Sequence, residues 1–89
     1  GNQLTQINPL SSLKKLTKLH LSNNRIIDVG PIKALSKLTE LNLVGNQIED
    51  ARVLAELTKL KKLNLSKNPI PEEQKALLKQ AMPKCKIIF

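Results

Sequence analysis

One stretch of the sequence decides the fold: Leu38-Thr-Glu-Leu41-Asn-Leu43-Val-Gly-Asn46-Gln-Ile48. One copy of its pattern runs from Leu16 to Ile26 and another from Leu60 to Ile70, at equal distances before and after it. Every copy keeps its leucines, its asparagine and its final isoleucine at the same places. A fixed 22-residue period predicts a solenoid, in which each repeat forms one coil that stacks on the next.

The leucines of each copy predict a short β-strand. Leu41 and Leu43 stand two positions apart, which places both side chains on one side of a strand. One strand cannot bury this pair alone, so neighbouring coils must cover it. We therefore expect a parallel sheet whose strands lie about 4.8 Å apart.

An asparagine follows each predicted strand. A buried side-chain amide both donates and accepts hydrogen bonds, so it can satisfy backbone groups of its own turn and of the next coil. We favour this structural ladder over a row of ligand-binding amides, because the side chains face inward. The ladder consists of Asn2, Asn24, Asn46 and Asn68.

The repeated pattern Leu-x-x-Leu-x-Leu-x-x-Asn-x-Ile resembles the leucine-rich repeat family, in its 22-residue bacterial, internalin-like class. The turn from Asn24 through Asp28 to Pro31 is similar to that class as well. The resemblance covers nearly the whole chain. It implies an α/β fold, a right-handed leucine-rich repeat solenoid or horseshoe, with a parallel β-sheet on the concave side and turns and short helices on the convex side.

Length and composition bound the fold further. The 89 residues allow one domain, and a hydrophobic share of 40% argues against a disordered chain. Phe89 is the sole aromatic residue, so the core must be aliphatic. Cys85 alone cannot form a disulfide framework, and no apolar run approaches the roughly 20 residues that cross a membrane. We expect one leucine-rich repeat domain over 1–89, with a partial N-terminal repeat at 1–15, strand-bearing repeats at 16–70 and a C-terminal cap at 71–89.

The predicted cap consists of a helix and a last strand. Pro71 suits the first turn of a helix, and the acidic residues after it favour the positive end of the helix dipole. The helix should end before Pro83, with an apolar stripe at Leu77, Leu78, Ala81 and Met82. Continuing the 22-residue period, residues 84–89 supply the last strand and place Cys85 in the buried leucine column.

Two other segments give contrasting expectations. Pro31 predicts a tight turn, whereas 50–57 is rich in helix formers and predicts a short helix with Asp50 as N-cap. At the N-terminus, Gly1 to Leu4 matches Gly45 to Ile48, which implies that a strand is missing before it. Either the chain is a fragment of a longer solenoid, or the uncapped N-terminal edge mediates self-association.

The sequence offers no catalytic constellation. It contains no glycine-rich phosphate loop, no nucleophile motif and no paired cysteine or histidine spacing. A metal site from His20 and Cys85 is not expected, because the two residues should lie on opposite faces of the sheet. We therefore expect no enzyme, no cofactor and no metal.

The side chains between the leucines should cover the open face of the sheet. The resemblance nominates this face for binding a protein partner, although its residues can also be explained as a solvated surface. The charges Lys18, Glu40 and Lys62 alternate in sign and can stabilise the sheet by themselves. The face forms three rows: Lys18, Glu40, Lys62 and Lys84; His20, Asn42, Asn64 and Lys86; Ser22, Val44, Ser66 and Ile88.

The net charge of +8 would attract polyanions, but no aromatic residues interleave the lysines for base stacking, so no specific nucleic-acid binding is expected. The leading interpretation is a non-catalytic protein-interaction module with an unidentified protein partner. The alternatives are a structural fragment or scaffold of a longer repeat protein and a non-specific polyanion binder. The compartment stays open, with the cytoplasm favoured over secretion or the cell surface.

Overall fold

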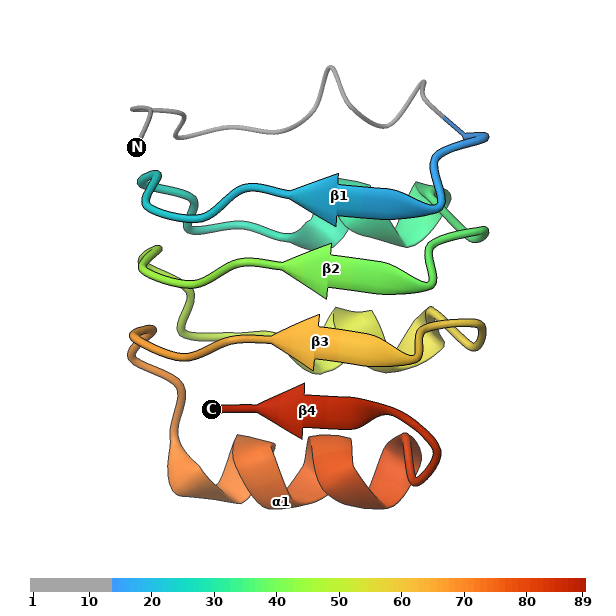
Figure 1. Cartoon of the computed structure of the whole chain (residues 1–89). Coiled ribbons are helices and arrows are strands. Elements are labelled where there is room, and N and C mark those ends of the chain that lie inside the picture. The colour runs from blue at the N-terminus through green and yellow to red at the C-terminus, as the bar shows by residue number, and fades with distance from the viewer. Residues whose placement is uncertain (1–13) are drawn as a thin grey trace.

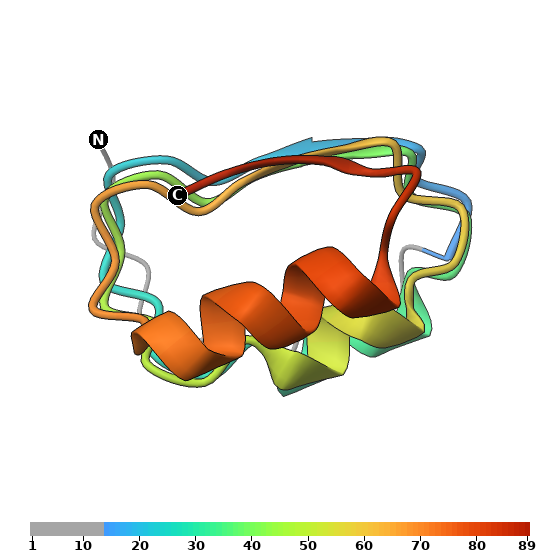
Figure 2. The same ribbon diagram turned by 90° about the horizontal axis from the view of Figure 1, so that it is seen from below.

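The structure is a computed structural model that describes residues 14–89. Its four short strands form one sheet, in which they are stacked side by side (Figure 1), and the helices form a second layer behind the sheet (Figure 2). All strands pair in parallel and in chain order, as predicted for an α/β solenoid. The elements are β1 (Lys18–His20), the 3-10 helix η2 (Gly30–Ala34), β2 (Glu40–Asn42), the 3-10 helix η3 (Arg52–Glu56), β3 (Lys62–Asn64), α1 (Glu72–Ala81) and β4 (Lys86–Ile88).

The core between the two layers is aliphatic. Leu41 and Leu63 from the strands, together with Ile32 and Leu54 from the 3-10 helices, each expose no more than 1% of their surface. Successive coils present these side chains at the same places, so each coil covers the next. Leu78 of α1 is fully buried and closes the core at its C-terminal end.

Asparagines that follow β2 and β3 join neighbouring coils. Asn46 Oδ1 accepts a hydrogen bond from the backbone N–H of Ile26 in the preceding coil, at 3.0 Å. Asn46 Nδ2 donates to the carbonyls of Leu21 and Leu43, each at 2.9 Å. Asn68 makes the same three kinds of bond one coil further on. The side-chain amide suits this place because it carries an acceptor and two donors.

The register of β4 differs from the sequence prediction. Lys62 pairs with Lys86 and Leu63 with Ile87, whereas the sequence period predicts Lys84 and Cys85 as their partners. The ten-residue α1 replaces a five-residue 3-10 helix, and this coil is two residues longer. Since side chains alternate with a period of two, the shift moves each residue along the strand without turning it to the other face.

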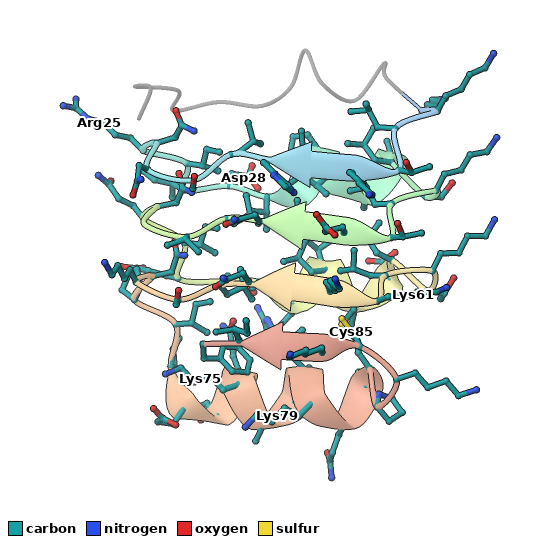
Figure 3. All side chains as sticks on the ribbon, viewed as in Figure 1. Arg25, Asp28, Lys61, Lys75, Lys79 and Cys85 are labelled. Atoms are coloured by element: carbon teal, nitrogen blue, oxygen red, sulfur yellow. The ribbon has the colours of Figure 1, made fainter. Side chains whose placement is uncertain are left out.

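The shift corrects two predictions for the cap. Cys85 is half-buried instead of belonging to the core, and it lies where the chain enters β4 (Figure 3). Leu77 is 43% exposed and Ala81 is exposed, so the apolar stripe of α1 narrows to Leu78 and Met82. The predicted limits of this helix between the two prolines are confirmed. Its Lys75 and Lys79 lie over the Phe89 ring, each with Nζ 5.7 Å from the centroid.

The predicted contrast between the two 3-10 segments is wrong. Both are five-residue 3-10 helices, because Pro31 fits a first turn in which its missing N–H has no helical partner. The predicted N-cap at Asp50 is wrong as well, since Ala51 holds that place. Asp50 Oδ1 instead accepts the backbone N–H of Arg52, at 3.1 Å.

Three predictions concern the N-terminal segment: the partial repeat at 1–15, Asn2 in the ladder and the open sheet edge. All three depend on residues 1–13, which lie outside the described part of the chain.

The turns after β1, β2 and β3 each contain one residue with a positive φ. These residues are Asn23, Gly45 and Lys67, with φ values of 58°, 72° and 61°, and they occupy the same place in successive repeats. Glycine adopts this conformation without steric cost, whereas other residues are strained. A Cβ atom on Gly45 would lie only 2.5 Å from Asn23 Oδ1 of the neighbouring coil.

Replacing Asn46 with alanine should lower the free energy of unfolding by about 2 kcal/mol, because the buried N–H of Ile26 loses its acceptor. Asn68→Ala is the matched control. It should cost about 1 kcal/mol, since Asn68 is only half-buried and water can reach the vacated groups. Urea denaturation measures both values. Equal losses would contradict the dependence on burial.

Gly45→Ala should destabilise the protein by about 1–2 kcal/mol through its positive φ, and further through the short contact with Asn23. Gly30→Ala is the comparison, because its new Cβ would meet only the Asp28 carboxylate, at 3.0 Å. That substitution should change stability by less than about 0.5 kcal/mol. Thermal unfolding of both variants tests the difference, and a similar effect at the two glycines would refute it.

Candidate functional site

The open face of the sheet displays the side chains that alternate with the buried leucines. Across β1, β2 and β3, Lys18, Glu40 and Lys62 are aligned, and His20, Asn42 and Asn64 form the next row. At β4 the first row continues with Lys86 and the second with Ile88, which the sequence period assigned to the second and third rows. Lys84 therefore lies in the turn before β4 and not in a strand. Ser22, Val44 and Ser66 are half-buried beyond the strand ends.

A shallow depression of about 280 Å³ lies over β2, β3 and β4, and we call it the sheet depression. The strands hold its position, since their leucines are anchored in the core below. It is lined by Leu41 and Leu63 and by the side chains of His20, Glu40, Asn42, Lys62, Asn64, Lys86 and Ile88.

One hydrogen-bonded pair occupies the β1 side of the depression. His20 Nε2 lies 2.7 Å from Glu40 Oε2, on a diagonal between neighbouring strands. This hydrogen bond lowers the pKa of Glu40, with smaller contributions from the nearby positive charges. Sequence reasoning expected Glu40 to interact with Lys18 and Lys62, but neither forms an ion pair with it among the described residues. Sequence reasoning could have found the contact of Glu40 with His20, because long side chains reach diagonal neighbours on the adjacent strand.

Two asparagine amides in the depression have a fixed orientation. Asn42 Oδ1 accepts the backbone N–H of Val44, at 3.1 Å. Asn64 Oδ1 accepts the backbone N–H of Ser66, at 3.1 Å, and its hydroxyl, at 2.9 Å. Since a backbone N–H can only donate, these bonds identify the oxygen of each amide. Both NH2 groups are left without a hydrogen-bond partner in residues 14–89.

The helical side of the molecule has a depression of a different character. Asp50 and Arg52 line it together with the exposed Ile27, and they form an ion pair with Nη2 2.7 Å from Oδ2. The guanidinium of Arg52, assisted by its backbone N–H, lowers the pKa of Asp50 to about 2. Because this pair satisfies its own charges, we place the candidate site on the sheet face.

The described residues assemble no metal centre. In the range 14–89, no three side chains of histidine, cysteine, aspartate or glutamate are grouped so that they could hold a metal ion. Burial raises the pKa of the Cys85 thiol, which disfavours the nucleophilic thiolate. Within the same range, no helix has the length and apolar composition to span a bilayer.

Comparisons with known proteins agree with this architecture. A family model described as leucine-rich repeats, in two copies, matches residues 14–56 and 36–77. The structure of an internalin C2 from Listeria monocytogenes is 41% identical over 80% of this chain, with a TM-score of 0.77. The structure of a leucine-rich repeat protein from Leptospira interrogans is 35% identical over 100% of this chain, with a TM-score of 0.87.

The matched structures are much longer than this chain, which spans 31% of the Listeria protein and 24% of the Leptospira protein. A search of the curated proteins gives no significant match. The shared features are therefore the repeat fold and its bacterial, internalin-like class.

Replacing His20 with alanine should raise the pKa of Glu40 toward its ordinary value of 4.5, because the hydrogen bond that lowers it is lost. Because the folded-state pKa of Glu40 is lowered, the pair stabilises the fold at pH values above the unfolded-state pKa. This stabilisation is lost as the pH falls through the folded-state pKa. Side-chain carboxyl NMR measures the titration. Lys62→Gln is the control, since its charge is the smallest contribution and its removal should shift the pKa less.

Proposed function

The chain belongs to the leucine-rich repeat family, and from this premise we propose that it is a non-catalytic interaction module that binds a partner protein across its open sheet face. The observation that carries the proposal is that polar groups without a partner in residues 14–89 line one shallow depression on this face. Lys62, Lys86 and the amide nitrogens of Asn42 and Asn64 have no hydrogen-bond or ion-pair partner within residues 14–89.

The rigidity of the face supports this proposal. Leu41 and Leu63 are buried, Leu19 and Ile87 pack against the core, and the asparagine bonds hold neighbouring coils together. A partner therefore meets groups that are already in position, which lowers the entropy cost of binding. Ile88 adds an apolar contact at the β4 end, since 46% of its surface is exposed.

The size of the face limits its affinity. The face is four strands wide, at a spacing of about 4.8 Å. It is about five residues long, counting the residues just beyond each strand, which gives a platform of roughly 250 Å². A standard stable interface buries about 800 Å² on each partner. We therefore expect weak binding by the strands alone, with further area contributed by the adjoining turns or by additional coils.

The alternative proposal is a structural segment whose sheet face binds nothing. The greater length of the matched structures favours it, because one segment of a longer solenoid needs no partner of its own. The two proposals predict different outcomes, because only the first expects a partner protein to bind the sheet face in preference to the helical side.

A photo-crosslinking amino acid separates them. Placed at Ile88 on the sheet face, it should capture protein adducts of discrete mass in bacterial or eukaryotic lysates. At Ile27, which is exposed on the helical side, it should not. Mass spectrometry measures both. Adding Asn42→Trp, which fills the sheet depression, should abolish the adducts from Ile88. Indistinguishable adducts from the two isoleucines would reject a dedicated sheet-face site.

A further inference from the structure

Building on the proposed function, we infer that the sheet depression selects its partner through a carboxylate, so that an acidic side chain of the partner protein sits between Lys62 and Lys86. The inference combines the charges of the depression with the direction of its hydrogen-bonding groups. It specifies the chemistry of the partner at this one place on the sheet face.

The two lysines form a like-charge pair at the β4 side of the depression. Lys62 and Lys86 stand directly opposite each other on β3 and β4. Like charges at this distance destabilise a sheet. Both residues are exposed, and neither forms an ion pair with any residue in 14–89. A carboxylate placed between them would attract both ammonium groups and relieve their mutual repulsion.

The only acidic side chain of the depression is already engaged. Glu40 is aligned with Lys62 across β2 and β3, yet its Oε2 is bonded to His20, at 2.7 Å. The hydrogen bond draws this carboxylate toward β1, away from the lysine pair between β3 and β4. A carboxylate of a partner would therefore supply the ion-pair contact that Glu40 does not make with Lys62 or Lys86.

The neutral groups beside the lysines offer amide N–H donors. The oxygens of Asn42 and Asn64 accept bonds from Val44 and Ser66, which leaves both NH2 groups available. Asn64 is the next outward-facing residue after Lys62 on β3, and Asn42 on β2 lies opposite Asn64. Two ammonium groups and two amide donors around one shallow space match the four lone-pair sites of a carboxylate.

The surroundings favour an acidic protein side chain over a phosphate polymer. The depression contains no aromatic residue on which a base could stack, and Glu40 at its β1 side would repel a long polyanion. A polyanion finds a better place at the turns that precede the strands, where Figure 3 shows Lys61. The exposed lysines of those turns that form no ion pair within residues 14–89 are Lys14, Lys15, Lys37, Lys59, Lys61 and Lys84.

The probe is a hexaglutamate peptide, titrated into the whole 89-residue chain and followed by NMR, with hexaglutamine as the uncharged comparison. Hexaglutamate should shift the side-chain NH2 signals of Asn42 and Asn64, and hexaglutamine should not. Lys62→Gln with Lys86→Gln should weaken binding about tenfold, as expected for two exposed charged contacts. Lys37→Gln with Lys59→Gln removes the same net charge from the turns and should weaken it less than about threefold.

Several results would overturn the inference. One is equal weakening by the two double variants, which would show attraction to net charge alone. Another is a polyphosphate probe that binds more tightly than hexaglutamate and shifts the same asparagine amides. Circular dichroism of each double variant confirms that the fold is retained, so loss of binding is attributable to the removed charges.

Failure of this inference can be told apart from failure of the proposed function. If the adduct at Ile88 forms and persists in Lys62→Gln with Lys86→Gln, the face binds a protein by other contacts and the carboxylate inference falls. If no adduct forms at Ile88, the proposed function itself falls.

Discussion

No single coil of this protein can bury its own leucines or satisfy its own turn, and the bond from the Ile26 N–H to Asn46 Oδ1 expresses that constraint. The acceptor belongs to one coil and the donor to the coil before it. Because the same amide also binds carbonyls in both coils, it holds their spacing and register together. The flat row of strands, and with it the candidate site, follows from repeating this contact.

The sequence period predicts register only where successive coils have the same length. It placed Lys18, Glu40 and Lys62 in one row correctly, because the two coils that separate them are equal in length. It failed at β4, because an α-helix follows a different path from a 3-10 helix and its coil takes two more residues. The period cannot reveal this difference, since its apolar columns resume after the helix as Met82, Cys85 and Ile87, as if the coil had kept its length.

The sheet face was predictable in composition but not in bonding. Alternation along a strand places Glu40 and Asn64 outside without knowledge of side-chain conformation. Whether Glu40 contacts a lysine or His20 depends on rotamers, which no spacing reveals. The amide orientations did have a signal: an asparagine side chain commonly accepts the N–H two residues later, as Asn42 does with Val44.

The cap makes the two ends of the sheet face chemically different. At the β1 end, His20 and Glu40 satisfy each other, whereas at the β4 end the longer coil brings Lys86 opposite Lys62 and Ile88 opposite Asn64. A charge without an ion-pair partner next to an exposed apolar side chain is a stronger binding feature than either alone. When a partner binds, the contact at each of the two residues excludes water from the other. A segment crossing the strands would therefore place an acidic side chain near β3 and β4 and an apolar one beside Ile88, which gives it a single preferred direction on the face.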